Sequence, residues 1–544
     1  MKHLFKRRIT TNNLTLCILL IVILLSYLHP LFTNRFYRSH DGEGITARFG
    51  AYVKAFQDGH IPPRWAGDLN FRYGTPVLNF FYPLPGYIAS LLYMLKFTLE
   101  QAYKTIGGIS FILSGIGFFL WMKGKYKPIL AFTAALFYAL IPYHFLNLYV
   151  RGEIAELLGL SLLPFVFFSW DAYLVRKTWT SLLICSTTYA LLILSHNGVA
   201  LTTTPLFIGY AIVTMLPSIT THAMKLLLIV LLALGLSCYF WLPAITEIKF
   251  THQRLMMDNI YKENFPSPLQ LISTRWGFGD QLNAPTGLSP QLGILHLILA
   301  IFAIFFIKKT FVMRYWSFAL IVSIFFSLSA SEILWRTFPL LAKLQFPWRI
   351  SGISSFIASV LAMHSLAQFP YRLVWILLLA LLLTSTMYAK INQPISHPDD
   401  YYFNFPGSTY FQDEATPIWT AGDPSQYPQV PAFTPEVQSQ ITSINRSTTT
   451  HIYQVTVPKQ TLFVDNTLYF PGWKAYIDGV KTSIEFQNHL HRGLVTFSIP
   501  QGTHAIRIQF EESPLRLISD IISLSTFLLM CVLLLYNRTS SRHI

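Results

Sequence analysis

Long apolar stretches recur along the whole 544-residue chain and constrain its fold more than any other feature. A segment of about 20 mostly apolar residues can cross the hydrocarbon core of a bilayer, which is roughly 30 Å thick. Because lipid offers no hydrogen-bond partners, such segments must be helices that satisfy their own backbone groups. The sequence therefore predicts a polytopic α-helical membrane protein. The thirteen candidate segments are 14–28, 79–98, 104–122, 128–146, 154–174, 179–195, 199–216, 223–243, 291–307, 313–330, 350–369, 372–389 and 516–536.

The charge of the chain agrees with a membrane location. Only 12% of the residues are charged, whereas about a quarter of a soluble domain is charged. Many of the residues behind the net charge of +15 lie in short loops between apolar segments, as the positive-inside bias requires. We therefore expect no nucleic-acid partner. The basic N-terminus precedes an apolar run without a small-residue cleavage site, so we expect a retained first span with a cytoplasmic N-terminus.

Basic loops predict the topology of the remaining segments. Arg176-Lys177, Lys308-Lys309 and the basic C-terminal tail favour the cytoplasm. These anchors place the polar region 391–515 outside, and the basic N-terminus places the first loop, 33–78, outside as well. Lys123, Lys125 and Lys127 also favour the cytoplasm, which leaves one segment too many between the first loop and these lysines. One early segment therefore does not cross the membrane in the usual way.

The segment 79–98 is the best candidate for this exception. Pro83 and Pro85 interrupt its start, and a proline removes a backbone donor that lipid cannot replace. We expect a re-entrant or interfacial helix there. The chain then has 12 to 13 membrane segments, of which twelve are full spans.

The region 391–515 differs in composition from the rest of the chain, with Pro, Gly, Asp and Ser in place of leucine. Asp478-Gly479 lies between two alternating runs and is a strong signal for a two-residue hairpin. We expect an extracytoplasmic all-β sandwich before the last transmembrane helix. Its predicted strands are 451–457, 461–470, 474–477, 481–486, 494–499 and 505–510. The predicted domains are thus a transmembrane domain 1–390, the β domain 391–515, and a last helix with a cytoplasmic tail, 516–544.

The first outer loop contains His40-Asp41-Gly42-Glu43, followed by an amphipathic stretch over 44–58. The apolar residues of this stretch share one helical face, so we expect a helix that lies flat at the membrane interface. Asp41 would lie at its start, at the bilayer surface, where a carboxylate could activate an acceptor. The structural alternative is that Asp41 simply caps the first helical turn, because Asp is a favoured N-cap.

Further charged residues lie at the outer ends of later spans. Arg151, Glu153 and Glu156 surround the start of 154–174, where buried charge is costly unless it is used or solvated. For these three residues we weigh a functional and a structural role equally. Glu247 follows the span 223–243, and we interpret it as an interface anchor.

The segment Gln345-Phe346-Pro347-Trp348-Arg349 lies just outside the span 350–369. The planar fork of an arginine can bind a lipid phosphate, and positive charge is disfavoured on the outer side, so Arg349 indicates a function. For Trp348 alone, an aromatic-belt anchor is the favoured interpretation. We interpret His196 as a satisfied interfacial histidine rather than a ligand.

Several other chemistries have no support in the sequence. The four cysteines lie inside apolar segments and form neither a CxxC motif nor a Cys/His ligand spacing. HExxH, P-loop, GxSxG and GxGxxG motifs in the required context do not occur, so metalloproteases, nucleotide hydrolases and serine hydrolases are not indicated.

A set of motifs spread over nearly the whole chain resembles the bacterial YfhO-like membrane proteins. Some members of that family carry the label 6-pyruvoyl-tetrahydropterin synthase-related. The label is not literal here, because the soluble synthase binds zinc through a histidine cluster that this sequence lacks. The motifs are His40-Asp41, Ile61-Pro62-Pro63-Arg64-Trp65, Phe81-Tyr82-Pro83, Tyr149-Val150-Arg151-Gly152-Glu153, Gln345 to Arg349, and Phe470 to Gly479.

These membrane proteins are in turn similar to GT-C glycosyltransferases, and the resemblance implies a GT-C-like fold and sugar transfer from a polyprenyl-phosphate-linked donor. It implies an acidic catalytic residue in the first outer loop, which makes Asp41 the candidate base and Glu43 its neighbouring carboxylate. Many GT-C enzymes have adjacent acidic residues, whereas this chain has His-Asp-Gly-Glu. The departure leaves open which carboxylate acts and whether a divalent cation takes part.

The same resemblance suggests how the remaining polar residues are used. Arg349 and Arg151 are the candidates for binding the donor phosphate, with Arg64 and Arg72 in reserve. The acceptor is a glycan, a lipid or a protein, and the reaction takes place on the outer face of the bacterial cytoplasmic membrane. The expected supporting residues are His40, His60, Trp65, Asp68, Glu153, Gln345 and Trp348.

Two other classes of protein are compatible with the sequence. A transporter or flippase of a lipid-linked or small polar substrate would also have about twelve spans, but the two halves lack matching broken helices. A non-catalytic envelope assembly protein would keep the architecture without the base. Loss of sugar transfer on substitution of Asp41 would distinguish the enzyme from both.

Overall fold

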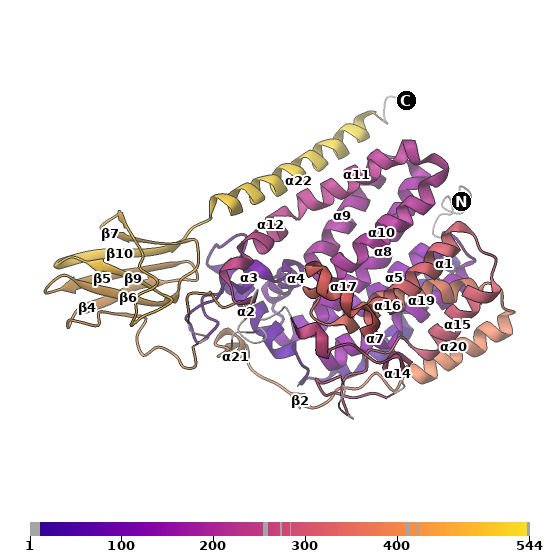
Figure 1. Ribbon diagram of the computed structural model, residues 1–544, viewed down its shortest axis with the longest axis horizontal. Helices are drawn as coiled ribbons and strands as arrows, with labels where there is room; N and C mark the ends of the chain where they lie inside the picture. The colour runs from indigo at the N-terminus through magenta and orange to yellow at the C-terminus, as the bar shows by residue number, and fades with distance from the viewer. Residues whose placement is uncertain are drawn as a thin grey trace.

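The protein, represented by a computed structural model, is described over residues 11–253, 259–272, 275–282, 284, 286–407, 409, 414–420 and 424–540. A large helical bundle occupies most of the molecule, and a β domain projects from one end of it (Figure 1). The last helix, α22 (Pro514–Ser540), runs from the β domain back along the bundle beside α11 (Ile219–Leu236). The predicted fold class, a helical membrane domain with a β domain before the last helix, is confirmed.

Within the described residues, five helices are long and apolar enough to cross a membrane, or seven if each of two bent pairs forms one span. The five are α5 (Leu99–Met122), α8 (Ile154–Arg176), α10 (Asn197–Met215), α11 and α22. The bent pairs are α6 (Pro128–Ala139) with α7 (Pro142–Phe145) and the π-helix Leu146–Arg151, and α16 (Phe311–Ser327) with Ser329–Thr337. Shorter apolar helices are α1 (Thr11–Tyr27), α9 (Trp179–Ser195), α15 (Ile294–Phe306) and α20 (Tyr371–Ser385).

The predicted count of twelve full spans therefore remains a prediction. Helices of 13 to 17 residues such as α15 and α9 reach only about 20–26 Å at 1.5 Å per residue, less than the thickness of the hydrocarbon core. The predicted segment 128–146 bends by 46° between Ala139 and Pro142. The segment 223–243 divides at Ser237 into α11 and α12 (Cys238–Glu247).

The segment 79–98 forms α4 (Pro83–Met94), whose 12 residues are too few for an ordinary span. The amphipathic stretch forms α2 (Gly42–Gln57), as predicted, and its expected position flat at the membrane interface remains a prediction. Most of its residues are buried, because α4, α5 and α21 (Asp399–Phe403) pack around it. The helices α2, α4 and α21 thus pack against one another, and the short buried helix α3 (Val77–Phe80) lies between α2 and α4 in the sequence.

Local sequence signals set several helix ends. Thr98, Thr178 and Thr310 begin α5, α9 and α16, and each hydroxyl accepts a hydrogen bond from the backbone N–H three residues on. The remaining helical elements of the bundle are α14 (Pro268–Ile272), α17 (Glu332–Thr337), α18 (Pro339–Ala342), η7 (Pro347–Arg349) and α19 (Ile350–Leu366), with short 3-10 turns at His29–Phe32, Leu216–Ser218, Ile248–Phe250, Ile260–Glu263 and Ser329–Ser331.

The β domain is a sandwich of two antiparallel sheets, with strand orders β4-β5-β10-β7-β8 and β3-β6-β9. Asp478 and Gly479 both have positive φ and join β7 to β8 in the predicted two-residue turn. All six predicted strands are present, whereas β3 and β4 are additional. The strands are β3 (Ala432–Phe433), β4 (Gln440–Arg446), β5 (Thr450–Val457), β6 (Thr461–Leu468), β7 (Trp473–Ile477), β8 (Val480–Thr482), β9 (Leu494–Ile499) and β10 (Gly502–Phe510). A separate pair, β1 (Phe36–Tyr37) and β2 (Pro394–Ile395), joins the first outer loop to the chain after α20.

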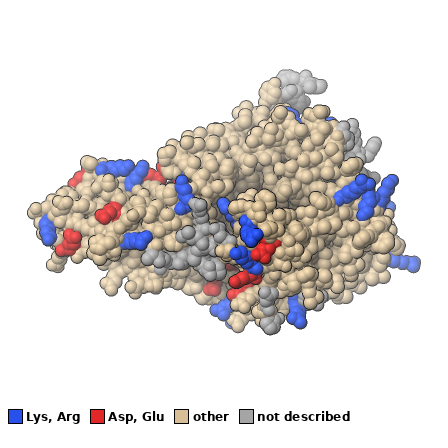
Figure 2. Space-filling model, viewed as in Figure 1, with Lys and Arg blue, Asp and Glu red and all other residues tan. Residues whose placement is uncertain are grey.

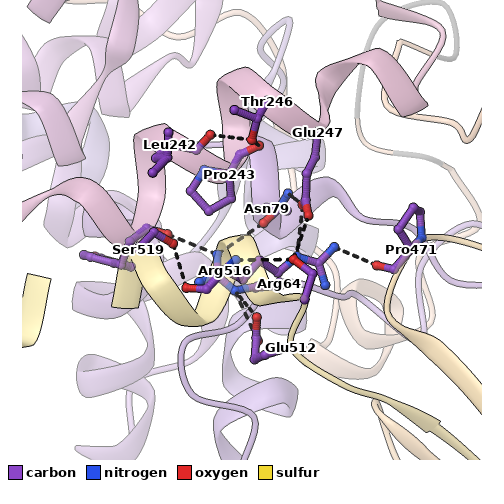
Figure 3. Close-up of polar contacts among 12 residues, drawn as sticks. Arg64, Asn79, Leu242, Pro243, Thr246, Glu247, Pro471, Glu512, Arg516 and Ser519 are labelled. Carbon is purple, nitrogen blue, oxygen red and sulfur yellow. Dashed lines mark hydrogen bonds and ion pairs between the residues drawn. The ribbon is translucent and has the colours of Figure 1, made fainter. Parts of the chain in front are cut away.

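A buried ion cluster joins the β domain and α22 to the bundle (Figure 3). Arg516 donates from Nε to the carboxylate of Glu247 at 2.9 Å and from its Nη2 to the Pro471 carbonyl at 2.8 Å. Asn79 also donates to Glu247, at 2.8 Å. The interpretation of Glu247 as an interface anchor is wrong, because its side chain is 4% exposed and paired with an arginine.

Arg64 extends this cluster into the first outer loop. Its guanidinium forms ion pairs with Glu512 at 3.1 Å and Asp520 at 2.6 Å, and it donates to Asn79 at 3.2 Å. Four segments distant in sequence therefore meet at this junction: the first loop, α3, α12 and the start of α22. Buried ion pairs of this kind fix a geometry because each charge depends on its partner.

We predict that Glu247→Ala destabilises the protein by about 3–5 kcal/mol, because it leaves the buried Arg516 guanidinium without its counter-charge. The midpoint of thermal unfolding in detergent measures the loss. Glu436→Ala, at an exposed position of the β domain, serves as the control and should change the midpoint little. Equal midpoints for the two variants would contradict a stabilising role for the cluster.

Candidate functional site

A cavity of about 1120 Å³ lies at the end of the bundle where α8 and α19 begin and α9 ends. Its walls come from the start of α2, the turn before α8, the turn between α9 and α10, and the turn before α19. Eight of the predicted site residues line it. They are His40, Asp41, Glu43, Arg151, Glu153, Gln345, Trp348 and Arg349.

The two carboxylates at the start of α2 are used differently. Glu43 is 3.2 Å from Nε2 of His397 and accepts a hydrogen bond from the Tyr401 hydroxyl at 3.3 Å. Asp41 is the N-cap residue of α2, but its side chain makes no capping hydrogen bond. The Asp41 carboxylate is exposed and lines the cavity. It forms no hydrogen bond or ion pair with another described side chain, although its charge acts on Arg151 and Glu414. The N-cap alternative therefore does not account for the Asp41 side chain.

The position of Asp41 is fixed through the backbone. The amides of His40 and Asp41 donate to the carbonyls of Val150 and Arg151, at 3.1 and 2.8 Å. Gly152 follows with a positive φ of 73°, and a Cβ atom there would lie 2.3 Å from the Ser39 hydroxyl oxygen. Only glycine fits this close approach without strain, which explains the Arg-Gly-Glu sequence at the turn.

Arg151 is committed to a buried ion pair. Its guanidinium is 2.7 Å from the Glu156 carboxylate and also donates to Asn147. Glu156 in addition accepts from the Tyr143 hydroxyl at 2.6 Å. Both charged side chains are almost inaccessible, at 3% and 2% exposure. The positive charge of Arg151 is therefore largely neutralised within the protein.

Arg349 is less completely paired. Its Nη1 donates to the Leu344 carbonyl at 3.1 Å and to Gln345 Oε1 at 2.8 Å, while Nε lies 3.9 Å from Glu156. Nε is buried and has no hydrogen-bond partner among the described residues. Arg349 thus retains donor capacity and positive charge at the cavity wall.

Trp348 and His196 occupy the same wall. The indole of Trp348 is 3% exposed and lies over the Arg151 guanidinium at 4.7 Å, so the interpretation as an aromatic-belt anchor is wrong. His196 accepts from the Val199 amide at 3.1 Å and begins α10, and its ring lies 4.7 Å from that of Tyr82. Burial lowers the pKa of His196 to about 4, which keeps the imidazole neutral at physiological pH.

The hydrogen-bond partners of two further predicted residues are clear. Tyr82 donates its hydroxyl proton to the Glu153 carboxylate, which connects the segment before α4 to the turn before α8. The His40 ring nitrogen Nε2 lies 2.9 Å from the Phe278 carbonyl. Both interactions hold segments of the cavity wall together.

Five predicted site residues do not line the cavity. Arg64 is held in the buried ion cluster, Arg72 donates to Asn404 and lies near Tyr427, and Trp65 packs into the core of the β domain. The two others are His60, whose pKa burial lowers to about 4, and Asp68, whose pKa burial raises. The first outer loop therefore contributes residues to two regions, the cavity and the junction with the β domain.

Several charged cavity residues were missed by the sequence analysis, and two of them, Arg48 and Glu414, are buried. Arg48 lies in α2 and is 7% exposed, and Glu414 precedes the β domain and is 8% exposed. Arg48 carried one available signal, since it is a charge in the middle of a helix that also presents an apolar face. Glu414 lies far from the other cavity residues in sequence, so only the tertiary structure reveals it.

Among the described residues, no three His, Cys, Asp or Glu side chains are grouped closely enough to hold a metal ion. Glu43 is already engaged by His397 and Tyr401, which leaves Asp41 as the one uncommitted carboxylate of the predicted pair.

A protein family described as 6-pyruvoyl-tetrahydropterin synthase related domain, membrane protein, matches residues 78–392. This range includes most of the helical bundle and the cavity segments after the first loop. No curated protein matches the sequence.

Two solved structures of sugar transferases are similar in fold at low identity. The arabinofuranosyltransferase AftD from Mycobacteria has 15% identity and a TM-score of 0.45, over 69% of this chain and 26% of that chain. The oligosaccharyltransferase of Archaeoglobus fulgidus has 12% identity and a TM-score of 0.45, over 75% of this chain and 59% of that chain. The chain thus spans about a quarter of the first protein and somewhat over half of the second, and overlap at this level carries no chemical argument.

We predict that substitution of Arg151 lowers the stability of the fold more than substitution of Arg349 does. Arg151→Gln should destabilise the protein by about 3–5 kcal/mol, because Glu156 is then buried without its counter-charge. Arg349→Gln should cost about 1 kcal/mol or less, since its side chain is partly exposed. Thermal unfolding in detergent measures both, and the double variant Arg151→Gln/Glu156→Gln should recover much of the loss. Equal destabilisation by the two single variants would show that the assignment of Arg151 to structure is incorrect.

Proposed function

The chain belongs to the family of membrane proteins with a 6-pyruvoyl-tetrahydropterin synthase related domain, and we propose that it is a glycosyltransferase. In this proposal it transfers a sugar from a polyprenyl-phosphate-linked donor to a hydroxyl-bearing acceptor, with Asp41 as the general base. The acceptor is a glycan, a lipid or a protein. The lipid-linked donor is what the resemblance to GT-C enzymes implies, whereas the base and the cation are argued from the residues of the cavity.

The observation that carries the proposal is that Asp41 and Arg349 both line one large cavity. The carboxylate of Asp41 is exposed and uncommitted, so it can accept a proton. Arg349 has a buried Nε without a hydrogen-bond partner among the described residues, so it can donate to an anion. A base and a cation at one site are the two groups that sugar transfer from a phosphate donor requires.

The proposed reaction is a single displacement. Asp41 removes the proton from the acceptor hydroxyl while the acceptor oxygen forms a bond to the anomeric carbon of the sugar. The bond between that carbon and the phosphate oxygen breaks, and the electron pair leaves with the phosphate. Arg349 stabilises the additional negative charge on the departing phosphate, because a charge-assisted hydrogen bond strengthens as charge develops.

In this mechanism Arg151 has a positioning role. It is neutralised by Glu156, and its carbonyl accepts the hydrogen bond from the Asp41 amide. The original assignment of Arg151 to phosphate binding is therefore replaced by one in which it holds the base in place. Trp348 lies over the Arg151 guanidinium and closes that side of the wall.

We place the cavity on the outer side of the bacterial cytoplasmic membrane. Support comes from the opposite end of the bundle, where α8 ends at Arg176 and Lys308-Lys309 joins α15 to α16. Lys and Arg without Asp or Glu gather at the end of the molecule away from the β domain (Figure 2). Positive charge of this kind favours the cytoplasm, so the cavity and the β domain would face outward.

We expect Asp41→Asn to lower sugar transfer by about 10²–10⁴-fold, the usual contribution of a general base. Purified protein in detergent or liposomes is given a panel of polyprenyl-phosphate donors with labelled sugars, and consumption of each donor is measured. Arg349→Ala should also lower transfer strongly. Arg507→Gln, at an exposed position of β10 outside the cavity, is the matched control and should retain transfer.

Thermal unfolding of each variant establishes that the loss is not due to misfolding. Glu43→Gln decides between the two carboxylates of the first loop, and a smaller effect than that of Asp41→Asn supports the assignment. If the wild type consumes no donor, or Asp41→Asn is fully active, the proposed reaction is wrong. Transport of a lipid-linked substrate or non-catalytic envelope assembly would then be the better explanation.

A further inference from the structure

We propose that Arg48, Arg349 and Glu414 form one anion-binding subsite of the cavity, in which binding of a phosphate group is accompanied by uptake of a proton at Glu414. The anion that suits two guanidinium groups is a phosphate oxyanion, in a lipid head group or free in solution. The three residues come from α2, the turn before α19 and the segment that leads to the β domain. The subsite would therefore couple the outer domain to the bundle.

Arg48 supplies the first observation. Its side chain is 7% exposed and lies over the Phe81 ring at 4.0 Å. Its Nε is buried, has no hydrogen-bond partner among the described residues, and belongs to a side chain that lines the cavity. Among the described residues no carboxylate forms an ion pair with Arg48, and a bound anion would stabilise a buried guanidinium in that state.

Arg349 supplies a second cation with spare donor capacity at the same cavity. Its contacts with Leu344 and Gln345 use Nη1, and its Nε has no hydrogen-bond partner among the described residues. Two such arginines lining one cavity offer several N–H donors, which suit the several acceptor oxygens of a phosphate group. Arg151, by contrast, is neutralised by Glu156 and supplies little attraction.

Glu414 is the acidic partner of these arginines. It accepts a hydrogen bond from Gln345 Nε2 at 3.2 Å, and the same Gln345 accepts from Arg349 through Oε1. Burial is the main reason that the pKa of Glu414 is raised to about 7; Arg349, Arg48 and the Gln345 hydrogen bond oppose the rise, and Asp41 contributes to it. The carboxyl group thus titrates near neutral pH under the influence of the two arginines and the proposed base.

The charges explain why anion binding and protonation are linked. When Glu414 is ionised, it partly compensates Arg48 and Arg349. A bound phosphate brings its own negative charge next to Glu414, which disfavours the carboxylate and raises its pKa further. Glu414 then takes up one proton from solvent as the anion binds. Anion affinity must therefore fall as pH rises through the pKa of Glu414 in the free protein.

The inference shares its cavity with the proposed function and rests on it only in naming phosphate as the anion. It requires no acceptor, no sugar and no reaction. A test by binding alone can therefore fail or succeed independently of the transfer assay. Asp41→Asn, which should abolish transfer, should leave anion binding in place.

We would measure binding of hexadecyl methyl phosphate to the full-length protein in detergent by calorimetry, at pH about 6 and about 8. This probe is a phosphodiester whose charge does not titrate near neutral pH, so any pH dependence belongs to the protein. With the Glu414 pKa at about 7, one linked proton weakens wild-type binding about tenfold between the two pH values. Dimethyl phosphate in a second arm distinguishes a free phosphate group from a lipid-linked one.

The variants separate the three roles. Arg48→Gln should weaken binding at least tenfold at both pH values, and Arg48→Lys should recover part of it. Glu414→Gln should bind with a nearly constant affinity from pH about 6 to about 8, and more tightly than the wild type at the higher pH. Arg507→Gln, at an exposed position of β10, and Glu436→Gln are the matched controls and should behave as the wild type does. Thermal unfolding of each variant identifies any that fail to fold.

Wild-type affinity in folded Arg48→Gln would overturn the inference, as would a Glu414→Gln protein that keeps the wild-type pH dependence. If only the alkyl phosphodiester binds, the subsite recognises a lipid phosphate. If both probes bind, the subsite recognises the phosphate group itself. If binding behaves as predicted but no donor sugar is transferred, the subsite stands and the proposed enzymatic function does not.

Discussion

The buried ion pair between Arg151 and Glu156 is the interaction on which the cavity depends. Removing two charges from water is costly, and the attraction between them repays this only with further hydrogen bonds, which Tyr143 and Asn147 supply here. The pair fixes the turn before α8, and the Arg151 carbonyl of that turn receives the amide of Asp41. The location of the proposed base is therefore set by a pair of charges that take no part in the proposed reaction.

The same principle separates the arginines of this protein into two groups. Arg64, Arg151 and Arg516 are buried against carboxylates. Arg64 and Arg516 join segments that are distant in sequence, whereas Arg151 fixes a local turn. Arg48 and Arg349 have buried donor atoms without hydrogen-bond partners among the described residues, and both line the cavity. Guanidinium groups of the first kind stabilise the fold. Guanidinium groups of the second kind remain able to bind an anion. Whether an arginine is paired with a carboxylate therefore separates structural from functional arginines in this protein.

The outer part of the chain is an integral part of this arrangement. The ion cluster around Arg516 and Glu247 joins the β domain to α12, and Asn79 of that cluster directly precedes Phe80, Phe81 and Tyr82 of the cavity wall. The segment leading to the β domain places Glu414 in the cavity as well. Through these two connections, movement of the outer domain would alter both the shape and the charge of the site.

The sequence by itself determined the membrane bundle, the β sandwich with its Asp478-Gly479 hairpin, and the cavity residues Asp41 and Arg349, because apolar length, alternation, turn chemistry and charge at span ends are local signals. Only the tertiary structure decided which charges neutralise one another. Neither the pairing of Glu247 with Arg516 nor the presence of Glu414 beside Arg349 is visible along the chain, since each joins segments far apart in sequence. Their roles depend on distance and burial, which no one-dimensional pattern records.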